Sequence, residues 1–203
     1  MSYSLMFEKV SSALGPLILI GLAVLAFFSP DNIRELLIYD RGRILSGEFW
    51  RLLTGHFLHT NLNHLLLNCA AVAVLWVLHS DYYRALGYLL LVVLLALLTG
   101  AGLLFFSPSV SWYVGLSGLL HGLIVWGGIH DIQRGWMTGY LIVLGTAGKV
   151  AWEQFGGDTS AAAALIGAPV AIDAHLWGAV AGALVPGLWL VFGGGWRRSV
   201  RQY

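Results

Sequence analysis

The segment Ala85–Phe106 contains no charged residue, and it is slightly longer than the ~20 apolar residues that a helix needs to cross a bilayer. The rest of the chain shares this character, because 58% of its 203 residues are hydrophobic and only 10% are charged. Its mean hydropathy of +0.78 is far from the balance of a water-soluble domain. We therefore expect lipid to surround most of the chain.

Further apolar segments are bounded by polar residues or by breaks that contain glycine or proline: 14–29, 62–78, 115–129, 137–152 and 172–192. Together with Ala85–Phe106 they predict an all-α membrane protein, a bundle of six transmembrane helices in one domain over residues 1–203. The segment 115–129 is short and begins with glycine, so we expect it to start inside the membrane plane. Such a start is tolerated only where the backbone is buried in protein or faces water.

Lysine and arginine residues near the predicted helix ends bear on orientation, because cytoplasmic ends carry more of them. Six lie on the side of the N-terminus and four lie opposite, while Lys149 lies inside a predicted span: Lys9, Arg84, Arg134, Arg197, Arg198 and Arg201 against Arg34, Arg41, Arg43 and Arg51. This difference predicts that both termini are cytoplasmic.

Two connections between the predicted helices are themselves partly apolar. The first, residues 30–61, holds all four opposing arginines among apolar positions, a mixture that predicts a hairpin at the membrane interface. The second, residues 161–172, is too short to span a bilayer and contains Pro169. We interpret it as a candidate flap over a site.

The charge balance excludes some classes of function. The net charge is +1, and no basic face of the kind that nucleic-acid binding needs is evident. The single cysteine, Cys69, lies in an apolar segment and is interpreted as a packing residue. No internal repeat is evident, which disfavours a transporter built from two similar halves.

A first cluster of polar side chains lies at the start of the predicted span 62–78: His56, His59, His64 and Asn68. Ionisable residues inside membrane spans often mark function. His64 and Asn68 are four positions apart, so on a helix both can direct hydrogen-bond donors at one point. A polar seam between helices is an alternative. A zinc site is another, although no His-Glu-x-x-His motif is present.

A second cluster is the sequence Gly-Leu-Ser-Gly-Leu-Leu-His at residues 115–121. It places Ser117 at the start of a short helix, where unpaired N–H groups and the helix dipole suit an oxyanion. Gly115 and Gly118 would let a substrate backbone approach closely. Small residues are also ordinary at helix contacts in membranes, which is the alternative interpretation.

A third cluster lies at the start of the last predicted span, where His175 precedes Gly178 and Gly182. Two glycines four positions apart let helix backbones pack tightly. Packing against the serine helix would bring the imidazole of His175 to the hydroxyl of Ser117. Jointly, the three clusters supply a nucleophile, a base and oxyanion donors, the roles that acyl transfer requires.

These residues resemble the rhomboid family of intramembrane serine proteases, in the right order and over nearly the whole chain. The matching features are Trp50-Arg51, the spacing of the His59, His64 and Asn68 side chains, Gly115-x-Ser117-Gly118, and Ala174-His175-x-x-Gly178-x-x-x-Gly182. The resemblance implies a six-helix bundle with a hydrated cavity open to the extracytoplasmic side. It also implies transmembrane protein substrates in the lipid bilayer and neither a cofactor nor a metal.

The resemblance implies catalytic roles as well. Ser117 and His175 would form a dyad without an acid, and His64, Asn68 and the backbone N–H of Ser117 would form the oxyanion hole. Asp173 is two residues from His175 and would point elsewhere on a helix, so it is not expected to be a third member.

One departure from the family pattern lies four residues after the serine. Many bacterial rhomboids have a tyrosine there that packs on the catalytic histidine, whereas this chain has His121. This form is similar to the rhombosortase branch, which implies substrates with a C-terminal tail of a glycine-rich motif, one membrane helix and basic residues. It also implies the bacterial inner membrane as location. A non-catalytic relative that binds transmembrane helices, and a small proton-relaying transporter or channel, are the alternatives.

Overall fold

The computed structural model describes residues 3–192 and consists mostly of helices. Side chains are described from residue 11 to residue 186. The α-helices are α1 Tyr3–Phe27, α2 Asp31–Leu37, α3 Arg41–Leu45, α4 Arg51–Thr54, α5 Leu62–His79, α6 Ala85–Phe106, α7 Ser117–Gln133, α8 Met137–Gln154, α9 Ser160–Ile166 and α10 Ile172–Phe192. Two 3₁₀ turns, η1 Gly55–Phe57 and η2 Ser80–Tyr82, and two short strands, β1 Tyr39–Asp40 and β2 Trp112–Tyr113, complete the described part.

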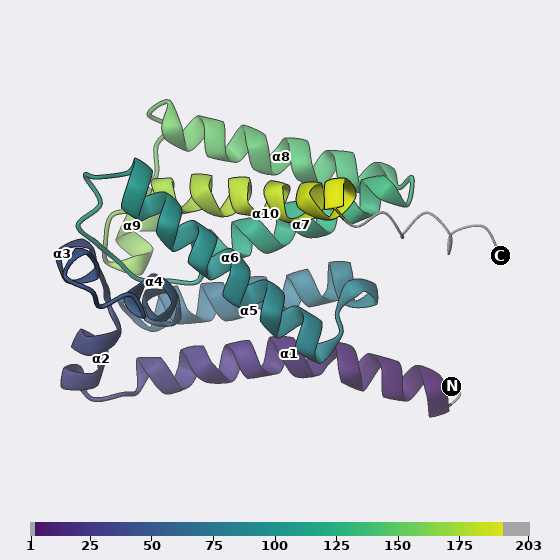
Figure 1. Cartoon of the computed structure of the whole chain (residues 1–203), viewed down its shortest axis with the longest axis horizontal. Coiled ribbons are helices and arrows are strands. Elements are labelled where there is room, and N and C mark those ends of the chain that lie inside the picture. The colour runs from purple at the N-terminus through teal and green to yellow at the C-terminus, as the bar shows by residue number, and fades with distance from the viewer. Residues whose placement is uncertain (1–2, 193–203) are drawn as a thin grey trace.

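Six of these helices are long, and each coincides with one predicted span (Figure 1). Helix α1 starts earlier than the sequence predicted, and α7 starts at Ser117 and runs on to Gln133. Among the described residues, the segments Leu62–Tyr82 and Ala85–Phe106 are long and apolar enough to cross a membrane, and Ser11–Phe27 is a shorter apolar helix. Six membrane crossings therefore stay a prediction, whereas the six long helices are observed.

Helices α7 and α10 lie against each other at backbone distance because glycines face glycines. A Cβ atom added to Gly178 would lie 1.8 Å from the carbonyl oxygen of Gly118, and one added to Gly182 would lie 2.2 Å from the oxygen of Gly122. No side chain larger than hydrogen fits at either position without separating the helices. This contact sets the distance between the beginnings of the two helices.

The connection between α1 and α5 folds onto the beginning of α7. Strand β1 pairs antiparallel with β2, with Tyr39 opposite Tyr113. Arg51 is fully buried, and its guanidinium donates to the carbonyl oxygens of Glu35 and Ile38 and to the carboxylate of Glu48. These contacts give the predicted interfacial hairpin a defined structure of short helices.

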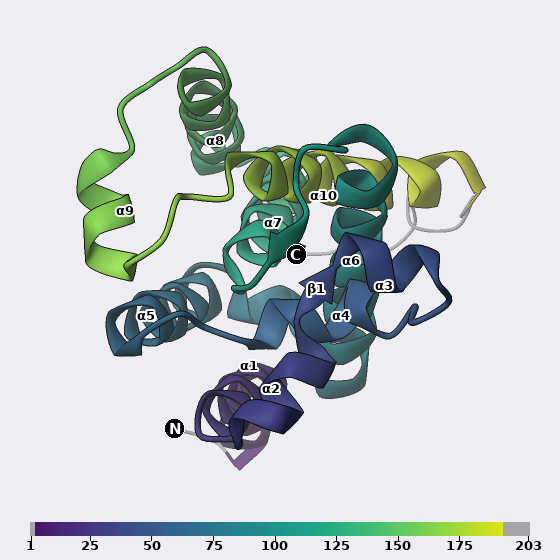
Figure 2. The same ribbon diagram turned by 90° about the vertical axis from the view of Figure 1, so that its left-hand side faces the viewer.

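Helix α9 lies between the ends of α8 and α5, as Figure 2 shows. It is tied to the start of α5, because Asn61 and Asn63 donate side-chain hydrogen bonds to the carbonyl oxygen of Leu165 at 3.1 and 3.3 Å. Thr60 donates its hydroxyl to the carbonyl oxygen of Ile166 at 2.5 Å. The predicted flap thus contains a short helix that is held at one side.

Helix α1 begins and α10 ends at the same end of the bundle (Figure 1). This arrangement fits the prediction that both termini lie on one side of a membrane. Three of the arginines behind that prediction, Arg197, Arg198 and Arg201, lie outside the described residues.

Candidate active site

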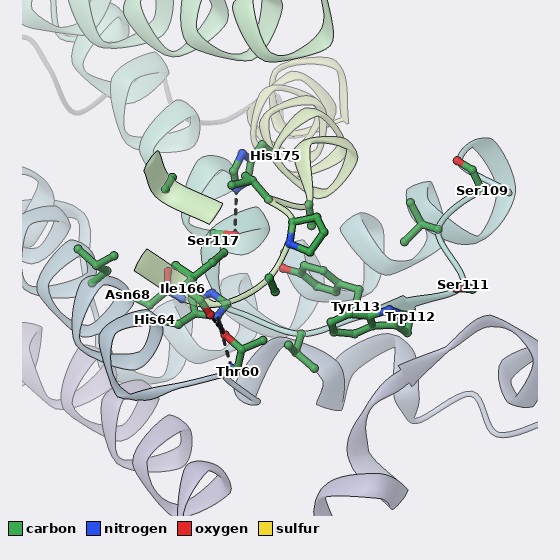
Figure 3. Close-up of a pocket in the computed structure, with 18 residues that line it drawn as sticks. Thr60, His64, Asn68, Ser109, Ser111, Trp112, Tyr113, Ser117, Ile166 and His175 are labelled. Carbon is green, nitrogen blue, oxygen red and sulfur yellow. Dashed lines mark hydrogen bonds between the residues drawn. The ribbon is translucent and has the colours of Figure 1, made fainter. Parts of the chain in front are cut away.

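The beginnings of α5, α7 and α10 meet at the end of the bundle opposite to the start of α1 (Figure 1). A cavity of about 360 Å³ lies there. Its lining includes both polar side chains and small apolar ones from the α9 region: Thr60, His64, Leu67, Asn68, Ser109, Val110, Ser111, Trp112, Tyr113, Val114, Ser117, Ala162, Ile166, Ala168, Pro169, Val170, Ala171 and His175. The structure thus brings residues of all three sequence clusters to one cavity (Figure 3).

The turn before Ser117 is fixed by several hydrogen bonds. Gly115 has a φ of +121°, a left-handed conformation that favours glycine. Its N–H donates to the carbonyl oxygen of Gly55 at 3.2 Å, and its carbonyl accepts from the hydroxyl of Tyr113. The same hydroxyl accepts from the N–H of Gly118 at 3.4 Å. The helix that follows begins at Ser117 itself, so the serine stands at a helix N-terminus.

The hydroxyl of Ser117 lies 3.0 Å from Nε2 of His175 (Figure 3). The two residues are 58 positions apart, and the glycine contact between α7 and α10 brings their helices together. At this distance the hydroxyl can donate a hydrogen bond to an unprotonated Nε2, which is the geometry a general base requires.

The other ring nitrogen of His175 contacts an acid that the sequence reasoning missed. Nδ1 lies 2.8 Å from Oε2 of Glu153, whose Oε1 accepts from Nζ of Lys149 at 2.6 Å. Glu153 lies in the last turn of α8, just beyond the predicted span 137–152. The available signal was the spacing of Lys149 and Glu153, which are four positions apart and share one helix face.

His121 and Asp173 both lie near His175, but only His121 contacts its ring. The ring of His121 stacks on that of His175, with centroids 4.1 Å apart and planes inclined by 17°. Its Nδ1 donates to the carbonyl oxygen of Ser117 at 2.7 Å. Asp173 instead accepts from the side-chain amide of Gln154 at 3.5 Å. The aromatic packing expected of His121 is therefore present, and Asp173 points elsewhere, as the sequence predicted.

His64 and Asn68 lie across the cavity from His175, beside the turn that precedes Ser117. A Cβ atom added to Gly115 would lie 2.7 Å from Nε2 of His64 and 3.8 Å from Nδ2 of Asn68. Nδ2 of Asn68 is buried and has no hydrogen-bond partner among the described residues. Nδ1 of His64 lies 3.0 Å from the hydroxyl oxygen of Thr60 and 3.5 Å from its backbone nitrogen, so Nε2 is the ring nitrogen that faces the turn. Two polar side chains thus converge beside the serine.

The remaining sequence candidates support this region without lining the cavity. His59 is fully buried, its ring centroid lies 4.9 Å from that of His64, and its Nδ1 donates to the carbonyl oxygen of Phe57 at 3.1 Å. Trp50 is about half exposed and donates to the carbonyl oxygen of Leu36. Trp50 and Arg51 therefore fasten the first connection rather than form part of the site.

A metal ion suits the arrangement poorly. Donor atoms of three residues, His121, Glu153 and His175, lie within 4.8 Å of one another. A metal ion must lie in the plane of each imidazole that binds it, and the two nearly parallel, stacked rings do not share such a point. Both nitrogens of His175 are also engaged, one with Ser117 and one with Glu153.

Comparison with known proteins adds one finding to this geometry. A family model described as Rhomboid domain matches residues 46–192. The matched range contains α4 to α10 and every residue that lines the cavity. No curated protein matches the chain.

Proposed function

Because the chain belongs to the rhomboid family of intramembrane serine proteases, we propose that it is an active endopeptidase that cleaves single-span membrane proteins. Ser117 is the nucleophile and His175 the base. The observation that carries this assignment is the 3.0 Å contact between Oγ of Ser117 and Nε2 of His175 at the edge of the cavity. A relative that only binds transmembrane helices would need neither group.

In the proposed reaction, Oγ of Ser117 forms a bond to the carbonyl carbon of the substrate while its proton passes to Nε2 of His175. The carbonyl π electrons move onto the oxygen, giving a tetrahedral oxyanion. Collapse of this intermediate breaks the C–N bond, and His175 gives the proton to the leaving amine. A water molecule then hydrolyses the acyl-enzyme by the same steps.

The oxyanion is stabilised by the side chains of His64 and Asn68 and by the backbone N–H of Ser117. The unpartnered Nδ2 of Asn68 supports this role, because a buried donor without a partner is costly unless a ligand supplies the acceptor. The helix N-terminus at Ser117 adds a favourable dipole. Such preorganised donors are worth about 10²–10³ in rate each.

The substrate class follows from the proposed membership in the rhombosortase branch. The substrates are membrane-anchored proteins with a C-terminal glycine-rich motif, one membrane helix and basic residues. The cavity supports this choice, because its α9 side is lined by small apolar residues that suit a chain with little side-chain bulk. His121 in the position four residues after the serine supports it as well.

The chain is an integral membrane protein, as its family and apolar helices indicate. We further place it in the bacterial inner membrane with six crossings and both termini in the cytoplasm. Support comes from the six long helices and from the shared end of the bundle at which α1 begins and α10 ends. The cavity then faces the extracytoplasmic side.

The direct test uses purified protein in detergent with a single-span substrate that carries a glycine-rich motif before its membrane helix. We expect cleavage near that motif and labelling by a fluorophosphonate probe. Ser117→Ala should abolish both. Ser111→Ala is the matched control, because Ser111 also lines the cavity but has no catalytic role in the proposal.

Two results would overturn parts of the proposal. Cleavage that persists in Ser117→Ala would remove the mechanism. Equal cleavage of a substrate whose glycines are replaced by leucine would leave the protease but remove the proposed substrate class.

A further inference from the structure

We propose that Glu153, held by Lys149, is the third member of the catalytic apparatus and positions His175 for proton transfer. This inference rests on the proposed protease function and extends it from a dyad to a chain of four side chains. The chain runs from Ser117 on α7 through His175 on α10 to Glu153 and Lys149 on α8.

The first argument is geometric. Oε2 of Glu153 lies 2.8 Å from Nδ1 of His175, and the side chains of both residues are only 7% exposed. A carboxylate can only accept a hydrogen bond, so Nδ1 carries the proton and Nε2 is left with its lone pair. That lone pair faces the hydroxyl of Ser117 at 3.0 Å. The contact therefore selects the tautomer that can act as a base.

The second argument concerns charge. His175 becomes an imidazolium when it takes the proton of Ser117, and the Glu153 carboxylate on its far side stabilises that cation. Lys149 is a second cation nearby, because its Nζ lies 3.5 Å from Nδ1 of His175. Without the carboxylate, Lys149 would repel the imidazolium.

The third argument is that burial of Glu153 needs a reason. An ionisable group inside a set of apolar helices is costly, and a helix contact between α8 and α10 could be made by apolar side chains instead. Lys149 offsets part of the cost at 2.6 Å, and its side chain is 50% exposed. It can therefore keep its charge solvated while it holds Oε1 of Glu153, which leaves Oε2 for the histidine.

The remaining groups that face His175 do not replace this contact. His121 of α7 stacks on the ring face, and its Nδ1 is bonded to the carbonyl oxygen of Ser117. His64 of α5 lies across the cavity. Asp173, two residues before His175, is paired with Gln154. Among the described residues, Glu153 is the acid that contacts the imidazole.

The decisive variant is Glu153→Gln, which keeps the shape of the side chain. Since Lys149 can only donate, the new amide turns its oxygen to Lys149 and its NH₂ group to Nδ1 of His175. Nδ1 must then accept, so the proton moves to Nε2 and the base is lost. We expect kcat and the rate of fluorophosphonate labelling to fall about 100-fold or more, with KM within about twofold of wild type.

Further variants separate positioning from mere packing. Lys149→Met in the Glu153→Gln background frees the amide to turn its oxygen to Nδ1. The kcat of this double variant should therefore be about tenfold higher than that of Glu153→Gln alone. Glu153→Asp keeps the charge and should be several-fold more active than Glu153→Gln. Asp173→Asn is the matched control, an equal change of charge on α10 that should leave kcat within about twofold. Thermal unfolding in detergent shows whether each variant is folded.

The outcomes distinguish this inference from the proposed function. If the wild-type protein neither cleaves substrate nor takes up the probe, the protease function itself fails. If the wild type is active and Ser117→Ala is dead, but folded Glu153→Gln keeps kcat within twofold, Glu153 has no catalytic part. A loss that appears only as a lower unfolding temperature or a higher KM would also overturn the inference.

Discussion

Each end of the bundle buries a histidine beside a carboxylate. At the cavity end, His175 contacts Glu153 at 2.8 Å. At the other end, Nε2 of His79, in the last turn of α5, lies 3.7 Å from Oδ2 of Asp131 on α7. The ring of His79 is fully buried, and neither of its nitrogens has a hydrogen-bond partner among the described residues.

The surroundings of the two histidines differ more than the two histidine–carboxylate pairs themselves do. His175 faces the hydroxyl of Ser117 and a cavity that the side chains of His64 and Asn68 also line. His79 faces Gly127, where an added Cβ would lie 2.3 Å from its Nδ1. Asp131 accepts instead from the hydroxyl of Tyr82 at 2.6 Å, and the guanidinium of Arg134 lies 4.3 Å from that tyrosine's ring centroid. A buried histidine and acid thus form a helix contact at one end and the proposed reaction centre at the other, depending on what the second ring nitrogen faces.

The strongest test of this difference between His175 and His79 is to replace each histidine in turn. His175→Ala should lower cleavage of a single-span substrate about 10⁴-fold, because the base is lost. His79→Ala should leave kcat within about threefold and lower the unfolding temperature in detergent, because a buried ring is replaced by a void. Loss of turnover in folded His79→Ala would show that the two ends are coupled.

Glycines offer a second comparison of the two ends. Gly178→Ala places a methyl group against the backbone oxygen of Gly118, which cannot move aside, so α7 and α10 must separate. We expect loss of both stability and cleavage. Gly127→Ala meets a side-chain ring, so it should cost about 1–3 kcal/mol of stability while the folded fraction still cleaves. Circular dichroism melts and cleavage rates measure the two effects, and equal activity of both variants would contradict the comparison.

Buried polar groups give a third comparison of the two ends of the bundle. Asn68→Ala removes a donor that has no partner in the resting protein, so kcat should fall about 100-fold while stability changes little. Asp131→Asn should do the reverse, with about 1–3 kcal/mol lost because the Tyr82 hydroxyl keeps a weaker partner. The control is Asn32→Ala, which removes an exposed amide on α2, away from the cavity. A large loss of stability in Asn68→Ala would argue for a polar seam instead of an oxyanion hole.

The smallest expected effect concerns pH and the histidines outside the long helices. Burial lowers the pKa of His56 to about 4, and burial together with the neighbouring His64 and Arg34 lowers the pKa of His59 to about 3. Both values lie below the ~6.5 of an unfolded histidine, so the unfolded chain binds more protons. This contribution to stability is complete above about pH 6.5 and is lost as the pH falls toward 4 and 3.

That prediction is measured by thermal unfolding between pH 7.5 and 5. The melting temperature should fall as the pH is lowered, and His59→Gln should flatten the fall because its side chain does not titrate. An equal slope in wild type and His59→Gln would contradict the assignment to His59.

Much of the fold followed from the sequence because lipid imposes a simple pattern. The six long helices were predicted within a few residues in most cases, since apolar runs ended at charges, glycines or prolines. Ser117, His175, His64 and Asn68 were identifiable because each is a polar residue at the beginning of an apolar run. The structure adds the distances between them, which spacing along the chain does not contain.

Glu153 was missed for a physical reason. Its contact with His175 depends on how α8 and α10 lie against each other, and no periodicity in either helix encodes that geometry. In the sequence, Glu153 looks like an ordinary polar residue flanking a span, and Lys149 looks like a stray charge inside one. The structure of the first connection was equally hidden, because β1 and β2 pair across 72 to 74 positions in strands of only two residues each.

That strand pair gives the serine turn a distant support. Since Tyr39 and Asp40 pair with Tyr113 and Trp112, the turn before the proposed nucleophile cannot loosen without opening the segment that follows α1. A single cut by an added protease between residues 41 and 50 would therefore be expected to lower the proposed cleavage activity, although it lies outside the proposed catalytic residues.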